Sequence, residues 1–411
     1  ALPIYIMKKF NKFLSVAVAS AMVMAMVGCG NTDNGSAATG TNAATESAAA
    51  SDSAASGSVF KIGGIGPTTG GAAVYGLAVQ HGAEIAVEEI NAAGGINGYQ
   101  VEFKFQDDEA DAEKSVNAYN ALKDWGAQII DGSTTSGACI AVTDKTKEDN
   151  MFQITPSGSA VECVQYDNNF RVCFSNPNQG LASAQYIGEN GLAEKIAVIY
   201  DSSDVYSSGI YEKFVKEAEN QPFEVVAAEA FTADNKTDFS VQLQKAKDAG
   251  ADMVFLPIYY QESALILTQA AAMGYAPKWF SCDGMDGILG GVDNFDVSLT
   301  EGVMLLTPFA ADATDDLTQS FVTKYKEKYG ETPNQFAADS YDAIYVIKAA
   351  IEKSGVTPDM SVSDICDGMK AAMTEITVDG LTGNGMTWTA DGEANKAPKA
   401  VVIENGAYKA M

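Results

Sequence analysis

The chain has 411 residues, which is long enough for two domains of ordinary size with substantial cores. It carries 26 basic and 54 acidic residues, and the resulting net charge of −28 argues against nucleic acid or anionic lipid as a partner. Its only histidine is His81 and its only arginine is Arg171. A multi-histidine metal site, a serine–histidine dyad and an arginine cluster for phosphate are therefore excluded, and we expect no metal and no cofactor.

The first 29 residues have the pattern of an export signal. After Met7 come three lysines, the apolar run Phe13–Val27, and then Gly28 and Cys29. The alternative is a transmembrane helix, but this run of about 15 residues is shorter than the roughly 20 that span a bilayer. The box Met26–Cys29 resembles that of bacterial lipoprotein signals, in which the cysteine is lipidated, although Met stands where Leu is usual.

Residues 30–58 are mostly Ser, Ala, Thr, Gly and Asn, a composition that predicts a flexible tether. Beyond it, strands and helices alternate. The predicted elements of the first series are a strand over 59–66, a helix over 75–93, a strand over 100–106, a helix over 112–125, a strand over 127–131, a helix over 138–149 and a strand over 151–155. Repeated strand–helix–strand units of this kind predict a parallel sheet covered by helices.

A second series of the same kind starts near residue 178. Its predicted helices cover 181–190, 209–220, 238–249 and 262–273, and its predicted strands cover 195–200, 223–229, 253–257, 278–281 and 302–307. Two long helices follow, over 317–329 and 336–354, and the segments 386–391 and 399–404 predict a hairpin. We therefore expect an α/β fold with two doubly wound, parallel-sheet lobes.

Polar turns follow two neighbouring strands of the first series. Ser136 follows one strand, and Ser157 and Ser159 follow the next. Ligands of doubly wound sheets bind at the carboxyl ends of the strands, and a helix N-terminus at this edge favours an anion. We hypothesise that these three serines hold the charged head of a small zwitterion. The alternative is that they only cap helices and fill turns.

The remaining motifs do not point to catalysis. The glycine-rich stretch Ile62–Gly70 lacks the Gly-x-Gly-x-x-Gly spacing of a nucleotide site. Asp107 and Asp108 are adjacent on one turn, so they do not face a bond from two sides as the carboxylates of a glycosidase do. We expect a protein that is not an enzyme; an adhesive or structural role is a weaker alternative.

Five cysteines follow Cys29, and an odd number does not pair completely. Cys163 and Cys173 are ten residues apart, and in an exported protein they are candidates for a disulfide. The alternative is that they are buried as small hydrophobic side chains, which we expect for the other three.

Together these features resemble the branched-chain amino-acid-binding proteins (Leu/Ile/Val type) of bacterial ABC transporters, which have the type I periplasmic-binding-protein fold. The resemblance extends over nearly all of residues 59–405. The segments that carry it are Ile65–Gly70, Tyr75-Gly76, Ile90–Gly98, Asp107-Asp108, Thr135–Gly137, Ile154–Ser157 and Phe170-Arg171.

The resemblance implies two lobes that close around a ligand about a three-strand hinge. We expect residues 1–29 to be a short extra segment and a signal, and 30–58 to be a tether. Lobe 1 would then comprise residues 59–177 and 308–380, and lobe 2 residues 178–307 and 381–411.

The resemblance also implies ligand-binding residues. Ser136 and Ser159 would meet the α-carboxylate of an amino acid, and Ser157 and Ser159 its α-ammonium. Asp283 stands where the family places an acidic residue for that ammonium. The aromatic wall would consist of Tyr75, Tyr206, Tyr259 and Phe336. Arg171 belongs to a Phe-Arg pair that the family uses structurally, outside the site.

We therefore expect a monomeric lipoprotein on the outer face of the cytoplasmic membrane, held there by its lipid anchor only. It would capture a free amino acid, of the branched-chain type, and deliver it to the permease subunits of an ABC importer. The alternative is a receptor of the same fold for another small solute, such as an amide, urea, an aromatic amino acid or a short peptide.

Overall fold

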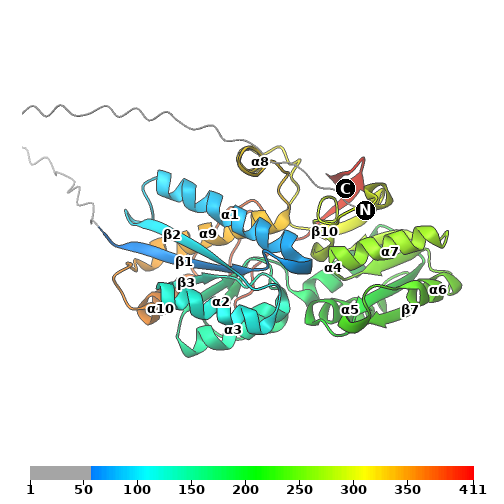
Figure 1. Cartoon of the computed structure of the whole chain (residues 1–411), viewed down its shortest axis with the longest axis horizontal. Coiled ribbons are helices and arrows are strands. Elements are labelled where there is room, and N and C mark those ends of the chain that lie inside the picture. Colours follow the sequence, from blue (N-terminus) through cyan, green and yellow to red (C-terminus); the bar gives the residue numbers. More distant parts are fainter. Residues whose placement is uncertain (1–56) are drawn as a thin grey trace, which may run out of the picture. The chain divides into compact units, whose positions relative to one another are not determined.

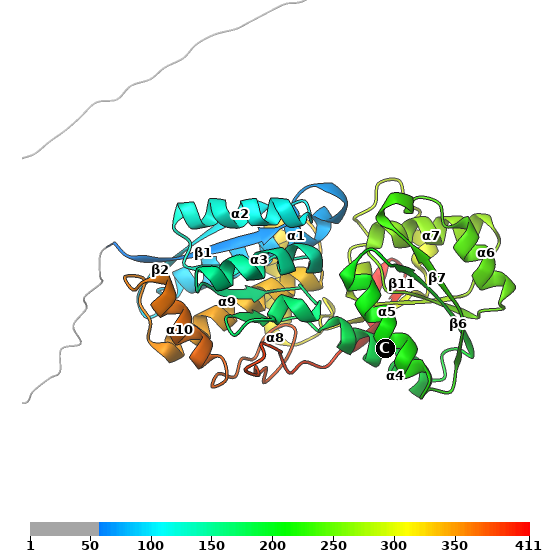
Figure 2. The same ribbon diagram turned by 90° about the horizontal axis from the view of Figure 1, so that it is seen from below.

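The computed structural model describes residues 57–411. The predicted signal, Cys29 and all but the end of the predicted tether lie outside the described residues. The described chain contains two β-sheets, each flanked by helices (Figures 1 and 2). We call the part built on the first sheet lobe 1 and the part built on the second sheet lobe 2.

The sheet of lobe 1 has five parallel strands in the order β2-β1-β3-β4-β5. The strands are β1 Val59–Gly66, β2 Gln100–Asp107, β3 Ile129–Asp131, β4 Phe152–Thr155 and β5 Asn169–Arg171. The helices of this part are α1 Ala73–Ala92, α2 Ala112–Trp125, α3 Ser136–Glu148, α8 Asp316–Tyr329, α9 Gln335–Ser354 and α10 Val362–Ala372. Ile129 packs in the core under α1 and α9, whereas Ile130 packs in the core under α2 and α3, so successive residues of β3 are buried on opposite faces.

The sheet of lobe 2 has seven strands in the order β12-β11-β10-β9-β8-β6-β7. The strands are β6 Lys195–Asp201, β7 Glu224–Phe231, β8 Met253–Leu256, β9 Lys278–Ser281, β10 Met304–Thr307, β11 Lys399–Glu404 and β12 Ala407–Ala410. The helices are α4 Asn176–Glu189, α5 Val205–Ala218, α6 Ser240–Asp248 and α7 Tyr260–Ala272. Strands β6 to β10 are parallel, as predicted, and the C-terminal strands β11 and β12 add an antiparallel edge to the same sheet.

The C-terminal hairpin differs from the prediction. Strand β11 pairs with β10 and β12, and the segment 386–391 forms only isolated bridges, such as Val378 with Met386. The turn is Asn405-Gly406, whose φ angles of 54° and 72° both lie in the left-handed region. Asn-Gly is the preferred dipeptide for such two-residue turns. The sequence therefore contained the correct signal, and the prediction of a hairpin with 386–391 was wrong.

Two helices of lobe 2 begin four or five residues earlier than predicted, and this matters for the site. Helix α4 begins at Asn176, with Ser175 as its N-cap, and α5 begins at Val205, with Asp204 as its N-cap. The Asp204 carboxylate accepts a hydrogen bond from the Tyr206 backbone N–H at 3.0 Å. Tyr206 therefore lies in the first turn of a capped helix. The predicted elements instead place it in the loop between residues 200 and 209.

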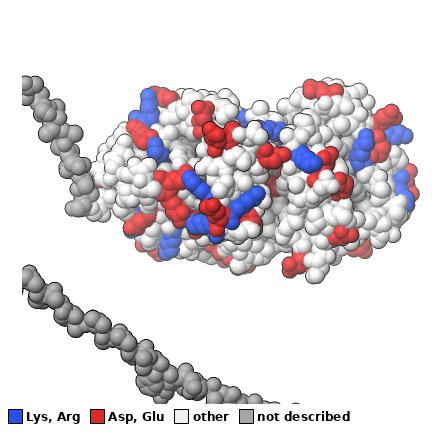
Figure 3. All heavy atoms as spheres, turned by 90° about the horizontal axis from the view of Figure 1, so that it is seen from above, with Lys and Arg blue, Asp and Glu red and all other residues white. Residues whose placement is uncertain are grey.

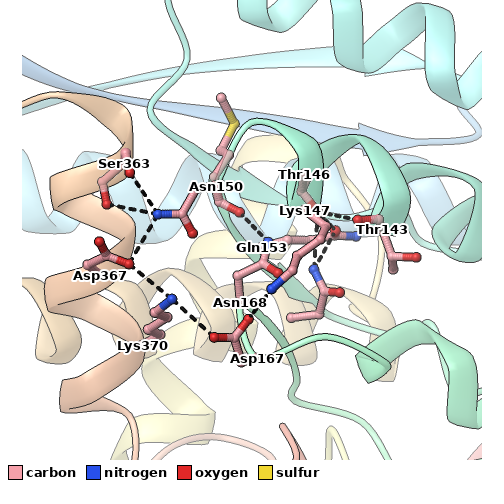
Figure 4. A network of polar contacts seen from close by, with 12 residues as sticks. Thr143, Thr146, Lys147, Asn150, Gln153, Asp167, Asn168, Ser363, Asp367 and Lys370 are labelled. Carbon is pink, nitrogen blue, oxygen red and sulfur yellow. Dashed lines mark hydrogen bonds and ion pairs between the residues drawn. The ribbon is translucent and has the colours of Figure 1, made fainter.

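Helix α10 was not predicted, and polar contacts fasten it to lobe 1 (Figure 4). The Asn150 side-chain amide donates to Ser363 Oγ at 2.8 Å and to Asp367 Oδ1 at 3.1 Å. The Lys370 ammonium lies 3.1 Å from Asp167 Oδ2, and Asp167 also pairs with Lys147 next to the end of α3. These contacts join residues about 200 positions apart, and the apolar face of the helix, with Ile365, Cys366 and Met369, is buried in the core.

The chain stays with lobe 1 longer than the predicted boundary at residue 381. The Thr382 hydroxyl donates to Asp342 Oδ2 in α9 at 2.5 Å, and Trp388 Nε1 donates to the Arg171 carbonyl at 2.8 Å. The Arg171 N–H in turn donates to the Gly392 carbonyl at 3.0 Å. These bonds attach the segment through Gly392 to lobe 1, and the return to lobe 2 precedes β11.

The proposed Cys163–Cys173 disulfide is not formed. The five cysteines of residues 57–411 are all free and buried. Cys163 lies in a small apolar cluster with Cys139 and Ala160, and its thiol donates to the Ser136 carbonyl at 3.7 Å. Burial raises the pKa of Cys163 and Cys173, as expected for small hydrophobic side chains.

The surface carries both the acidic and the basic side chains that the composition provides. On the face drawn in Figure 3, Lys and Arg side chains are scattered among Asp and Glu side chains. Within residues 57–411, each helix is too short or too polar to cross a bilayer.

Candidate functional site

Seven of the eight predicted ligand-binding residues line one small cavity to which both lobes contribute. Lobe 1 provides Tyr75 of α1, Ser136 of α3, Phe336 of α9 and Ser157 of the loop after β4, together with Thr134 and Thr135. Lobe 2 provides Tyr206, Tyr259 and Asp283, together with Gly284. The cavity volume is about 10 Å³, which is room for one water-sized sphere. An amino acid is larger, so its entry requires the two sides to move apart.

Ser159 is the exception. It is fully buried but does not line the cavity. Its N–H, which we expected to meet a ligand carboxylate, donates instead to Ser136 Oγ at 3.2 Å, and the Ala160 N–H donates to the same oxygen at 3.1 Å. Ser136 is thereby fixed at the start of α3 by the loop that carries Ser159. In this arrangement Ser159 positions Ser136, and its direct contact with a ligand stays a prediction.

Ser157 and Arg171 hold the same loop. The Ser157 hydroxyl donates to the Thr134 carbonyl at 2.6 Å. The buried guanidinium of Arg171 donates to the carbonyls of Gly158 at 3.2 Å and Ala160 at 2.8 Å. Arg171 is absent from the cavity lining, so its contacts are structural, in line with the role that the resemblance implies.

Thr135 is a cavity residue that the sequence did not single out. It is the N-cap residue of α3, but its side chain makes no capping hydrogen bond. Its hydroxyl oxygen is buried and has no hydrogen-bond partner among residues 57–411. Since buried hydroxyls are nearly always paired, this group is a candidate for contact with a ligand. The first N–H groups of α3, which lack intrahelical partners, lie beside it and favour an anion.

The opposite side of the cavity carries a buried carboxylate. Asp283, which begins a short 3₁₀ turn after β9, is 5% exposed. Its Oδ1 accepts from the Tyr206 hydroxyl at 2.6 Å, and its Oδ2 accepts from the Gln179 side-chain amide at 3.0 Å. Burial raises the pKa of Asp283 to about 7, against the opposing effect of the Tyr206 hydrogen bond. The group is thus poised between its neutral and charged forms, and a neighbouring cation would favour the carboxylate.

Two glutamines position Asp283, and sequence reasoning did not identify either. Gln179 lies in the first turns of α4, and the Gln335 amide donates to the Asp283 carbonyl at 2.9 Å. The Thr307 hydroxyl, at the end of β10, lies 3.0 Å from Gln335 Oε1. Gln179 precedes the helix predicted over 181–190, and the earlier start of α4 at Asn176 is what orients it toward Asp283.

Aromatic rings form the wall between the two polar sides. The rings of Tyr206 and Tyr259 are stacked with their centroids 4.9 Å apart, and the ring centroids of Tyr75 and Phe336 are 4.4 Å apart. The Tyr75 hydroxyl donates to the Gly284 carbonyl and accepts from the Tyr260 N–H at 3.2 Å, so it links the two lobes directly. The wall can enclose an apolar side chain and shield an ammonium group.

The cavity has a helix start that favours an anion on one lobe, a buried carboxylate on the other lobe, and aromatic rings between them. This arrangement is that of a two-lobed binding protein for a small zwitterion. The sequence matches the periplasmic binding protein family over residues 59–407, and the chain belongs to this family. The family consists of binding proteins, in agreement with the prediction that the chain is not an enzyme.

Relatives of known type agree with this assignment. The chain is 30% identical over 300 residues to Leu/Ile/Val-binding protein homolog 3 of Brucella melitensis, covering 72% of this chain and 80% of the relative. It is also 30% identical over 302 residues to the leucine-, isoleucine-, valine-, threonine- and alanine-binding protein of Pseudomonas aeruginosa, covering 72% and 78%.

Two solved structures share the fold. The leucine-binding protein LivK of Thermotoga maritima has a TM-score of 0.76 at 28% identity, covering 86% of this chain and 98% of that one. The branched-chain amino-acid transporter substrate-binding protein LivJ of Streptococcus pneumoniae, solved in complex with isoleucine, has a TM-score of 0.77 at 28% identity, covering 86% and 99%. These comparisons confirm the family resemblance and the type I fold.

Proposed function

We propose that the protein captures a free amino acid of the branched-chain type between its two lobes and delivers it to an ABC importer. The supporting observation is that one cavity joins the start of α3, with the unpaired Thr135 hydroxyl, to the buried carboxylate of Asp283 on the other lobe. The α-carboxylate would bind at Thr135 and Ser136, and the α-ammonium at Asp283. The names of the relatives support the same ligand class.

Closure follows from this arrangement. The ligand would first bind to lobe 1, and Tyr206, Tyr259 and Asp283 would then complete the site from lobe 2. Only the closed form makes both sets of contacts, so the ligand shifts the population toward it. The closed form would be the one that the permease subunits recognise.

Titration calorimetry of the full chain with each of the twenty amino acids tests the ligand class. We expect binding of leucine, isoleucine and valine, and none of 4-methylpentanoate, which lacks the ammonium group of leucine. Acetamide, urea, aromatic amino acids and dipeptides serve as the alternative ligands. Binding of one of these, with no response to any aliphatic amino acid, would redirect the assignment to another solute.

The location and state of the protein are part of the proposal. We infer export, a lipid on Cys29, a tether to residue 58 and a monomeric domain at the outer face of the cytoplasmic membrane. The support is the order of basic, apolar and small residues before Cys29. Mass spectrometry of the membrane-extracted protein would detect a lipidated N-terminal cysteine, and an unmodified Cys29 would contradict the anchor. Size-exclusion chromatography with light scattering tests the monomer.

A further inference from the structure

A second cavity, far larger than the first, lies beside α1 and the C-terminal hairpin. Its volume is about 490 Å³, within the range of small-molecule sites in proteins. It is bounded by α1, the end of α8, the segments 286–291 and 331–334, and the turn between β11 and β12. It shares no lining residue with the first cavity. A ligand bound here would therefore contact a separate set of side chains.

Asp286 gives this cavity its most specific chemical feature. The residue is 4% exposed and lines the cavity. Its Oδ2 accepts from the Gln335 N–H at the start of α9, at 2.9 Å, whereas its Oδ1 has no hydrogen-bond partner among residues 57–411. A buried carboxylate oxygen without a partner is rare, because desolvation of the charge is costly. The site thus offers an acceptor oxygen for which the neighbouring Tyr408 hydroxyl is the competing donor of the described chain.

The groups around Asp286 define what could use this acceptor. Tyr408 is next to it: the Tyr408 hydroxyl accepts from the Gly287 N–H at 3.3 Å, and burial, followed by the charge of Asp286, raises the pKa of Tyr408. Asp312 and Glu331 also line the cavity, and Lys326 is the single basic residue of the lining. Burial raises the pKa of Asp286 to about 6, so at neutral pH the carboxylate form prevails.

The rest of the lining is largely apolar. It includes Val74 and Leu77 of α1, together with Leu289 and Pro333. Leu77 is 38% exposed, so part of its side chain is accessible to a ligand in the cavity. Three carboxylates against one ammonium group disfavour an anion, and the apolar lining favours a ligand with a hydrocarbon body.

We propose that this cavity is a second ligand site, for an organic cation with an apolar body, whose ammonium group binds Asp286 Oδ1 while its hydrocarbon part packs against α1 and Leu289. A primary amine with an aryl or alkyl chain has this chemistry, because its ammonium group stays protonated at neutral pH. The proposal is independent of the amino-acid site.

The test uses 4-phenylbutylamine as the probe, with 4-phenylbutanol and 4-phenylbutyrate as neutral and anionic counterparts of the same shape. Calorimetry of the full chain at pH 7.5 should give an affinity for the amine at least tenfold higher than for the alcohol, and no binding of the acid. Equal affinities for amine and alcohol would overturn the proposal.

Variants locate the binding. Asp286→Asn retains an oxygen for the Gln335 N–H and should lower the amine affinity to that of the alcohol. Gly290→Leu adds a side chain to the lining, where a new Cβ meets no atom within 4 Å, and should weaken the amine and the alcohol together. Asp283→Asn, in the first cavity, should leave amine binding unchanged. Loss of amine binding in Asp283→Asn, or wild-type binding in a folded Asp286→Asn, would refute the site; circular dichroism checks folding.

Discussion

Two buried aspartates near the junction of the lobes differ in their partners. Asp339 of α9, 2% exposed, forms an ion pair with the buried Lys396 ammonium at 2.8 Å. Asp283, 5% exposed, accepts hydrogen bonds from Tyr206 and Gln179, and no cationic side chain of residues 57–411 pairs with it. The charge of Asp339 is thus compensated within the protein, whereas a cation for Asp283 has to come from outside. The comparison separates a structural carboxylate from one available to a ligand.

The largest expected effect is at the compensated pair. Lys396→Met leaves Asp339 buried without its cation, and we expect the free energy of unfolding to fall by about 3–5 kcal/mol. Urea denaturation measures it. Lys353→Met, which breaks the exposed pair with Glu375, is the matched control and should change stability little. Equal stability of the two variants would remove the distinction between the aspartates.

Asp283→Asn should act on binding rather than on folding. It removes the charge that would meet the ligand ammonium, and the loss of one member of a buried charge pair weakens binding by about 2–5 kcal/mol, or at least about thirtyfold. Calorimetry with leucine measures the change. Asp286→Asn, the same substitution three residues later and in the other cavity, should retain the wild-type affinity. A folded Asp283→Asn with unchanged affinity would contradict the ammonium site.

Thr135→Val tests the other end of the site. A hydrogen bond to a charged group contributes about 1.5–3 kcal/mol, so leucine affinity should fall by about tenfold to a hundredfold. The free energy of unfolding should not fall, because the hydroxyl has no partner within the described chain. Its removal eliminates the cost of burying an unpaired polar group.

Thr155→Val is the matched control for Thr135→Val. The Thr155 hydroxyl donates to the Ser133 carbonyl and accepts from the Gly158 N–H, both at 2.7 Å. Its removal should therefore lower the melting temperature. Unchanged leucine affinity in Thr135→Val would exclude this hydroxyl from the ligand site.

The smallest effect is the change of leucine affinity over a single pH unit. Because burial raises the pKa of Asp283 to about 7, the free protein is increasingly protonated there below that pH, and leucine affinity should fall by up to tenfold per pH unit between about 7 and 5. Tyr206 and Tyr75 face the same group and stay neutral in this range, since burial raises the pKa of both tyrosines.

The negative charge of Asp339 also raises the pKa of Asp283, and burial raises the pKa of Asp339 itself to about 6. We therefore expect a smaller second step in the pH profile of leucine affinity near pH 6. The ligand 4-methylpentanoate, which carries no ammonium group and should not bind at neutral pH, should begin to bind only toward pH 5, because protonation of Asp283 removes a repulsion. Calorimetry from pH 5 to 8 measures both ligands. A flat profile for leucine would show that Asp283 does not meet the ammonium group.

Much of the fold followed from local patterns. Strand β1 and helix α2 have the predicted bounds, and the strand–helix alternation gave both lobes. The errors arose where local signals compete. The antiparallel β11–β12 pair depends on the Asn405-Gly406 turn, and α10 buries Ile365, Cys366 and Met369 in the core and contacts Asn150 and Asp167 from a distant part of the chain.

By itself, the sequence determined which residue types are available: hydroxyls after two neighbouring strands, an acid after a third, and too few histidines and arginines for other chemistry. Their closeness in the chain also placed Ser136 and Ser157 at one sheet edge, because neighbouring parallel strands end together.

Only the tertiary structure decided which groups remain free. The Ser136 hydroxyl oxygen accepts hydrogen bonds from two backbone N–H groups, whereas Thr135 and Asp286 each have one side-chain oxygen without a hydrogen-bond partner in the described chain. Hydrogen-bond saturation depends on distances of a few ångströms between segments far apart in sequence, and local pattern does not encode them.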